Sequence, residues 1–304
     1  MTAIAPDFEE SERVLAGISL ALLGNLAFAS SDAIIKLLST HYSIFQLAFT
    51  QASFASIPLL VLLMKDGGPG RLRVKNPKLV VLRGLLAGFG GTCAVFAFSQ
   101  LPLADSYAIA FSTPLIVTIL SIPILGEKVG IHRWGAVVVG LVGVLVMVRP
   151  GFAAVGPGHG AMFLAAVNGA FVVLVMRKIA RYEQRAVMVT AAVGGQLLVN
   201  LPGVVLTFQT PALADLGLAA VGGLLMGSGQ FLIVRGLSLA PASAVAPMQY
   251  SMMLWAVIYG VLVFATPIDP ILLAGAAIVI GSGLYIMHRE RRRGRTLRAH
   301  VDSV

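Results

Sequence analysis

The chain has 304 residues, of which 58% are hydrophobic and only 12% charged, and it carries a net charge of +9. A soluble domain carries about 25% charged residues, so this composition excludes an ordinary water-soluble protein. The basic residues lie between long apolar stretches, so phospholipid head groups, and not nucleic acid, are the expected counter-charge. The single cysteine, Cys93, excludes an intramolecular disulfide framework. We therefore expect an all-α polytopic membrane protein.

Ten apolar stretches are long enough to cross the hydrocarbon as helices, which takes about 20 residues each. They cover residues 14–38, 43–64, 78–99, 103–125, 131–149, 159–180, 185–208, 213–236, 242–264 and 270–288. An acidic cytoplasmic segment, 1–13, is expected before the first span, and it is unlike a cleavable signal peptide. A basic cytoplasmic tail, 289–304, follows the last span.

The distribution of lysine and arginine sets the expected orientation. If both termini are cytoplasmic, the only basic residues on the outer side are Lys36 and Arg149. Removing or adding one span would destroy this asymmetry, so the positive-inside rule supports ten spans in the cell (inner or plasma) membrane. The arginines between 289 and 298 are expected to bind anionic lipid head groups.

The first span carries four candidate site residues. Asn25 and Phe28 are three residues apart, so the amide and the ring share one helix face that suits a substrate with a polar head and an apolar body. The alternative for Asn25 is a hydrogen bond between two helices. Asp32 and Lys36 lie one turn apart and are able to neutralise each other. They form either a proton-coupling pair that contacts substrate or a structural pair with Lys36 reaching the head groups.

The third and fourth spans add Phe96, Tyr107, Phe111 and Ser112 as candidates for a substrate cavity. Serine more often bonds to the preceding helical turn, and each aromatic residue can instead serve ordinary helix packing. Pro114 removes a backbone hydrogen bond, which predicts a bend that is either a hinge or a static kink. In the short loop that follows, Glu127-Lys128 either locks a closed gate or caps a helix.

The second half offers matching candidates in its sixth, eighth and ninth spans. Asn168 and Phe171 repeat the amide and ring of the first span, and Pro247 is a second hinge candidate. The remaining candidates for substrate binding are Gln230, Gln249, Tyr250 and Trp255. The glutamines rank above the serines because they cannot bond to their own helix as cheaply.

These matches belong to an internal duplication. The segments that align are Asn25–Phe28 with Asn168–Phe171, Pro58 with Pro202, Leu101–Ala110 with Leu237–Ala246, and Gly135 and Gly143 with Gly275 and Gly283. They divide the chain into a first five-helix repeat, 14–149, and a second, 150–288. Because five is odd, the repeats enter the membrane from opposite sides, which places a substrate cavity between them near the midplane. Channels can also be built from inverted repeats.

The residues of the fourth and fifth spans resemble a known family. The pattern consists of the segment 101–114, the turn Leu125-Gly-Glu-Lys128, Trp134-Gly135 and Gly140-Leu-Val-Gly143. It is similar to the EamA-type signature of the drug/metabolite transporter superfamily, and among its members the amino acid exporters, including those for aromatic amino acids. The resemblance implies ten helices around a central cavity and transport of small metabolites. The chain departs from the pattern at Gln249-Tyr250, where many members have Glu-Pro, and at Thr266, which replaces a glutamate.

The motifs of enzymes are missing from the sequence. All five histidines fall at span ends or in the tail, so no Ser–His pair is expected within the membrane. His-Glu-x-x-His and Walker A motifs are absent, so we expect no enzyme, no cofactor and no metal site. We predict a secondary transporter that works by alternating access, most simply an amino acid exporter. The alternatives are an exporter of cationic drugs or of another metabolite class, and a channel or non-transporting membrane scaffold.

Overall fold

The computed structural model describes residues 5–65, 73–127, 129–148, 155–179 and 182–301, and every regular element in these ranges is a helix. The first half holds α1 (Ala5–Leu38), α2 (Ile44–Lys65), α3 (Pro77–Gln100), α4 (Leu103–Ala110), α5 (Thr113–Leu125) and α6 (Ile131–Val148). The second half holds α7 (Pro157–Ile179), α8 (Arg185–Thr207), α9 (Leu213–Leu239), α10 (Ala242–Val245), the 3-10 helix η2 (Ala246–Tyr250), α11 (Ser251–Leu262) and α12 (Pro270–Val301). Lys128 and Arg149 lie outside the described residues.

Seven helical segments in the described ranges are long and apolar enough to cross a membrane. Two further helices have shorter apolar parts, at Trp134–Met147 in α6 and Pro270–Tyr285 in α12. The chain is therefore a multi-pass α-helical membrane protein, and a helix or helix pair occupies each of the ten predicted stretches. Helix α1 begins ahead of the first predicted span, and α12 continues through the predicted basic tail to Val301.

Two of the predicted spans are broken helices. The fourth is divided into α4 and α5 at Phe111 and Ser112, and Pro114 lies in the first turn of α5. The ninth changes from α10 to a 3-10 turn over Ala246–Tyr250, which contains Pro247, before α11 begins. Both breaks lie where the sequence places a proline, because proline has no N–H to donate to the preceding turn. The role of either proline as a hinge stays a prediction.

The helices pack across the two halves of the chain as well as within them. Helix α9 lies against α1 and α2, α8 lies against α2 and α3, α7 against α3, and α12 against α6. Close approach depends on glycine, as at the crossing of α3 and α8: a Cβ added at Gly195 would lie less than 3.0 Å from the backbone of Gly84. Small residues at such contacts let the backbones meet, which stabilises helix packing in lipid.

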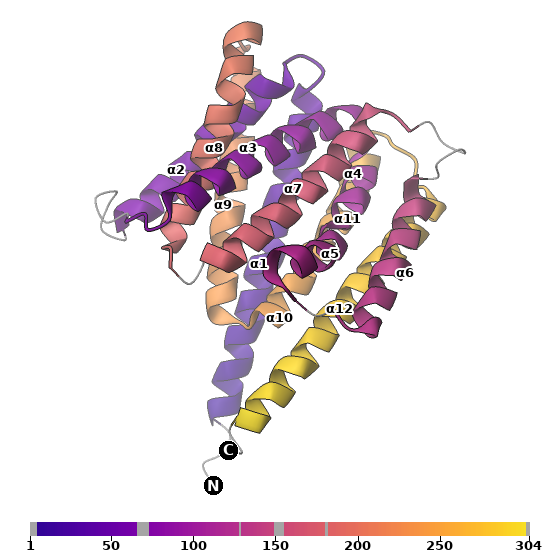
Figure 1. Ribbon diagram of the computed structural model, residues 1–304. Coiled ribbons are helices and arrows are strands. Elements are labelled where there is room, and N and C mark those ends of the chain that lie inside the picture. Colours follow the sequence, from indigo (N-terminus) through magenta and orange to yellow (C-terminus); the bar gives the residue numbers. More distant parts are fainter. Residues whose placement is uncertain (1–4, 66–72, 128, 149–154, 180–181, 302–304) are drawn as a thin grey trace.

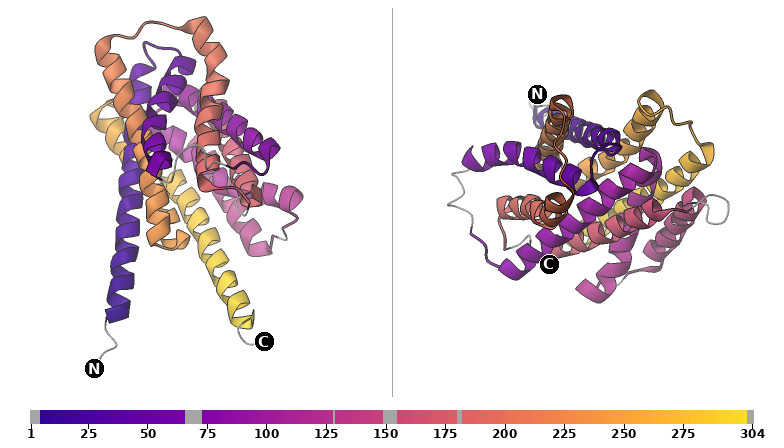
Figure 2. Two further views of the ribbon diagram at one scale, coloured as in Figure 1. Left: turned by 90° about the vertical axis from the view of Figure 1, so that its left-hand side faces the viewer. Right: turned by 90° about the horizontal axis from the view of Figure 1, so that it is seen from above.

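The ends of the long helices show how the molecule is arranged along its long axis. Figures 1 and 2 show that the start of α1 and the end of α12 lie at the same end of the molecule. At the opposite end, hydrogen bonds join the α1–α2 turn to the α8–α9 turn. Tyr42 Oη donates to Asp215 Oδ2 at 2.7 Å, and Gln46 Nε2 donates to the carbonyl of Gln209 at 2.7 Å. The bond to Asp215 raises the pKa of Tyr42, so this phenol stays protonated at physiological pH.

The main apolar core lies in the half of the molecule away from the α1 and α12 ends. It contains buried residues of α1, α3, α4, α11 and α12, among them Ile35, Phe98, Leu103, Met253 and Leu272. This core packs the helices together on that side, which we call the closed side, and the cavity found there, between α4, α11 and the start of α12, measures about 220 Å³. A cavity opens in the other half, and the broken helices form part of its wall.

Candidate functional site

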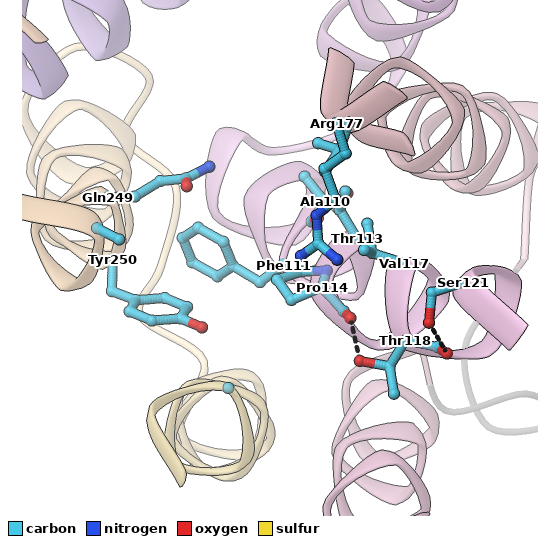
Figure 3. Close-up of a pocket in the computed structure, with 13 residues that line it drawn as sticks. Ala110, Phe111, Thr113, Pro114, Val117, Thr118, Ser121, Arg177, Gln249 and Tyr250 are labelled. Carbon is cyan, nitrogen blue, oxygen red and sulfur yellow. Dashed lines mark hydrogen bonds between the residues drawn. The ribbon is translucent and has the colours of Figure 1, made fainter. Parts of the chain in front are cut away.

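A cavity of about 290 Å³ lies between residues of both halves of the chain. Its wall comes from α4, α5 and α7 on one side and from η2 and α12 on the other (Figure 3). The lining residues are Ala110, Phe111, Thr113, Pro114, Val117, Thr118, Ser121, Val173, Arg177, Ala246, Gln249, Tyr250 and Gly283. The cavity therefore lies at the two helix breaks, near the ends of α5 and α7.

The two aromatic residues of the lining, Phe111 and Tyr250, belong to a chain of rings that crosses from one half to the other, whereas the other two rings, Tyr107 and Phe98, are buried outside the lining. Phe111 and Tyr250 meet edge to face, with ring centroids 5.1 Å apart, and Tyr107 stacks on Phe111 at 6.4 Å. Phe98 contacts Tyr107 from α3 at 5.8 Å. Aromatic faces attract both apolar groups and cations, so this wall suits a substrate with an aromatic or weakly hydrated cationic body.

Most of the hydroxyl groups around the cavity already bond to the backbone. Thr118 Oγ1 donates to the carbonyl of Pro114 at 3.0 Å, and Ser121 Oγ donates to that of Thr118 at 2.9 Å. Thr113 Oγ1 donates to the carbonyl of Ala110 at 2.7 Å. The side chain of Gln249, by contrast, has no hydrogen-bond partner among the described residues, and Figure 3 shows its amide pointing into the cavity. Gln249 is therefore available to a ligand.

Arg177 brings the one charged group found among the described lining residues. It stands in the last turn of α7 and reaches across the cavity toward Thr113 and Pro114 (Figure 3). Its Nη1 lies 3.4 Å from Oε1 of Glu127 in the loop after α5. Sequence reasoning missed Arg177 because it counted this residue only among the inner basic charges.

The charged residues of the first span lie apart from this cavity and have separate partners. Tyr107 Oη donates to Asp32 Oδ2 at 2.6 Å. Lys36 Nζ donates to the carbonyls of Phe98 and Leu101, at 3.1 and 2.7 Å, which ties α1 to the end of α3. These contacts join helices on the closed side of the molecule, and the roles of Asp32 and Lys36 in coupling stay predictions.

The two asparagines differ although they align. Asn25 is 3% exposed, and its Nδ2 donates to the carbonyl of Met248 in η2 at 2.7 Å. Asn168 Nδ2 donates at 3.3 Å to Leu164 in its own helix, while its Oδ1 is buried without a partner. Asn25 thus fixes one of the helix breaks, and Asn168 retains an unused acceptor between α7 and α3.

The other predicted site residues separate into two groups. Phe111, Pro114, Gln249 and Tyr250 line the cavity together. Six predicted residues are outside its lining: Phe28, Phe96, Ser112, Phe171, Gln230 and Trp255. Phe28 packs against α9 near Gly229, and Phe96, Phe171 and Gln230 are half-buried. Ser112 Oγ and Trp255 Nε1 are buried without hydrogen-bond partners among the described residues. Besides Arg177, sequence reasoning missed Val117, Thr118, Ser121 and Val173, whose contact with the cavity depends on how α5 and α7 cross.

Comparison with known proteins defines the class to which this fold and cavity belong. The model of the EamA-like transporter family matches residues 15–149. The S-adenosylmethionine uptake transporter of Rickettsia conorii is 30% identical over 278 residues, which are 91% of this chain and 94% of that protein. The chain therefore belongs to the EamA-like transporter family and is a membrane transporter.

Further relatives show how varied the cargo of this family is. The pseudopaline exporter CntI of Pseudomonas aeruginosa is 26% identical over 87% of this chain and 93% of its own length. A solved crystal structure that is 18% identical superposes with a TM-score of 0.63 and covers 93% of this chain and 98% of its own, which shows a shared fold. Uptake and export thus both occur among the relatives, so neither direction follows from the family alone.

Proposed function

We propose that this protein is a secondary transporter of amino-acid-type metabolites, meaning molecules with an α-amino and an α-carboxylate group on an aromatic or apolar body. The observation that carries the proposal is the cavity between the broken helices of the two halves, with an aromatic wall, a free amide and one guanidinium. Family membership supports transport as the activity. S-adenosylmethionine and the aromatic amino acids are the first substrates to test.

Alternating access between two inverted repeats is part of the proposal. In such an arrangement each helix of the first half has a counterpart in the second: α1 and α7, α2 and α8, α3 and α9, α4–α5 and α10–α11, and α6 and α12. A two-fold axis that relates the halves then turns each contact between two helices into the contact between their counterparts. The observed packing agrees with this: α1 lies on α9 and α7 on α3, while α2 lies on α8 and α6 on α12. Reciprocal contacts of this kind support ten spans as two inverted five-helix repeats, 14–149 and 150–288, around one central site.

The orientation that we propose has both termini in the cytoplasm of a bacterial cell, with the protein in the inner membrane. The charge asymmetry of the loops supports it, as does the position of the α1 start and the α12 end on one side (Figure 2). In this orientation the cavity near Arg177 faces the cytoplasm, and the closed core faces outward.

The chemistry of the cavity favours this class of substrate over simple cationic drugs. Among the described lining residues the single charge is the positive one of Arg177, which repels a plain cation and attracts a carboxylate. A sulfonium or ammonium group that accompanies a carboxylate can still contact the faces of Phe111 and Tyr250. S-adenosylmethionine combines all of these features with an aromatic base, and so offers the wall the same kinds of group as an aromatic amino acid does.

Flux into proteoliposomes tests the proposal. We expect saturable, competed uptake of radiolabelled S-adenosylmethionine or tryptophan by the purified protein. Tyr250→Ala should lower this flux about tenfold or more by removing part of the aromatic wall, whereas Tyr182→Ala, on an exposed loop residue, should leave it unchanged. Movement of other metabolites without any amino-acid-type substrate would contradict the substrate class, and flux that never saturates would favour a channel.

The same vesicles test energy coupling. If Asp32 carries the coupled proton, flux by the wild type depends on an imposed pH gradient and flux by Asp32→Asn does not. Lys36→Gln serves as the comparison, because Lys36 bonds to backbone carbonyls and not to Asp32. Equal dependence on the gradient in all three proteins would assign Asp32 a structural role.

A further inference from the structure

We propose that Arg177 binds the carboxylate of the substrate and that Glu127 competes with the substrate for this guanidinium. The inference rests on the transport function proposed above and assigns a specificity-determining residue within its site. Arg177 lines the cavity from α7, and Glu127 stands in the loop that joins α5 to α6. Substrate binding then exchanges one carboxylate for another at the same cation.

The contact between Arg177 and Glu127 is loose enough to be exchanged. The two side chains are 42% and 34% exposed, and the nitrogen and oxygen atoms are 3.4 Å apart. Charge-assisted hydrogen bonds of this type are usually about 2.7–2.9 Å long, and exposed ion pairs contribute little to stability. The guanidinium makes no other hydrogen bond within the described part of the chain, although it offers five N–H groups. Most of its donors are therefore available to a ligand.

The surroundings of Arg177 favour a second carboxylate inside the cavity. The side chain shares the lining of the cavity with the apolar residues Val117, Val173 and Phe111. Charges attract more strongly next to apolar walls than in water. A planar guanidinium can also hold both oxygens of one carboxylate at once, which fixes the orientation of the bound molecule.

The remaining polar group completes a binding arrangement for an amino acid head. Figure 3 shows the Gln249 amide directed into the cavity from the wall opposite Arg177, with Phe111 and Tyr250 nearby. An amide oxygen accepts a hydrogen bond from an ammonium group. A carboxylate at Arg177, an ammonium group at Gln249 and a ring against Phe111 and Tyr250 together account for each part of an aromatic amino acid.

The competition also links occupancy of the cavity to the loop after α5. While Glu127 holds Arg177, it joins this loop to the end of α7. A substrate carboxylate that takes its place releases the connection. Occupancy of the cavity thereby changes how the loop after α5 is held to the end of α7.

Ligand binding by purified protein tests the inference apart from transport. Thermal unfolding in detergent is measured with S-adenosylmethionine and L-tryptophan, and with decarboxylated S-adenosylmethionine and L-tryptophanamide, which lack the carboxylate. In the wild type we expect at least one acid to bind about tenfold more tightly than its partner without the carboxylate. Arg177→Gln should reduce this preference to about twofold or less, and Arg177→Lys should keep part of it.

Two further variants separate the specific role from general effects. Lys178→Gln changes the neighbouring charge on α7, which lies outside the cavity lining, and should keep the full carboxylate preference. Glu127→Gln should tighten carboxylate binding about two- to tenfold by removing the competitor, without changing the affinity for the amide. Size-exclusion chromatography establishes that each variant is folded.

The outcomes distinguish the two proposals. An undiminished carboxylate preference in Arg177→Gln, weaker carboxylate binding in Glu127→Gln, or no binding of any acid to the wild type would overturn the inference. Carboxylate-dependent binding without flux would leave the inference standing and contradict the proposed function. Flux of amino acids that is insensitive to Arg177→Gln would do the reverse.

Discussion

Single side chains donate hydrogen bonds to backbone carbonyls where the helices of this protein are broken. Pro114 has no N–H to bond to the carbonyl of Ala110, and the Thr113 hydroxyl donates to that carbonyl instead at 2.7 Å. In lipid a carbonyl without a hydrogen bond costs free energy. The hydroxyl of Thr113 therefore keeps the carbonyl of Ala110 hydrogen-bonded at the break beside Pro114. At the second break Asn25 joins α1 to η2 by donating to the carbonyl of Met248, which also accepts from the Ser251 N–H.

The bond from Asn25 leads to a prediction about stability. Asn25→Ala removes the hydrogen bond between α1 and the carbonyl of Met248, which keeps the Ser251 N–H as a donor, and should lower the free energy of unfolding by about 0.6–1.7 kcal/mol. The aligned residue Asn168 is the matched control, because its amide bonds only within its own helix. Denaturation of both variants in detergent measures the difference. An equal loss in Asn168→Ala would mean that the bond between helices adds nothing.

The contact between Tyr107 and Asp32 gives a second residue-scale prediction. Tyr107→Phe removes the hydroxyl and keeps the ring, and Asp32→Ala removes the acceptor. A double-mutant cycle should give a coupling of about 1–3 kcal/mol in unfolding free energy. Tyr42→Phe combined with Asp32→Ala should be additive, because Tyr42 bonds to Asp215 instead. Additivity in both cycles would show that the short bond contributes no stability.

How far the site could be predicted differs from residue to residue. Phe111, Gln249 and Tyr250 were predictable because they are aromatic or amide side chains beside a proline in a span. Arg177 was not, since its contact with the cavity depends on the tilt of α7 against α5. The partners of Asp32 and Lys36 were missed for a similar reason: the spacing in the chain pairs them with each other, whereas helix crossing brings Tyr107 and backbone carbonyls closer.

At the scale of elements, close packing between helices depends on where glycine lies. The α3–α8 crossing is the clearest case, because Gly84, Gly88 and Gly195 bring the two backbones together. Hydropathy predicted the positions of the helices to within a few residues at most ends, since apolar length is what lipid demands. It could not predict the lengths of α4, α10 and η2, because a break leaves the mean hydropathy of the span unchanged.

Two neighbouring glycines of α8 provide a matched test of this packing. A Cβ at Gly195 meets the backbone of Gly84, whereas a Cβ at Gly194 meets no atom within 4 Å. Gly195→Ala should therefore destabilise the protein by about 1–3 kcal/mol through overpacking, and Gly194→Ala should be neutral or slightly stabilising. The midpoint of thermal unfolding reports both. A similar loss in the two variants would contradict the structure at this crossing.

For the whole molecule, the proposed topology can be tested by labelling from one side. In a Cys93→Ala background, single cysteines replace Tyr182, Thr210, Pro241 or Ile268, all in turns between helices. An impermeant maleimide added to intact cells should label positions 210 and 268 and reach 182 and 241 only after permeabilisation. Labelling of positions 241 and 268 from the same side would mean that the segment α10–α11 does not cross the membrane.

The hydrogen bonds between the α1–α2 turn and the α8–α9 turn have a mechanical consequence. These turns come from different halves of the chain, which we propose to be two repeats, and their contacts on the closed side involve Tyr42, Gln46, Gln209 and Asp215. A motion that kept each repeat rigid would have to break this connection in every cycle. A motion that carries α1, α2, α8 and α9 as one body leaves it intact and concentrates the displacement at the broken helices. The boundary between the two proposed repeats and the boundary along which the protein moves are then different surfaces.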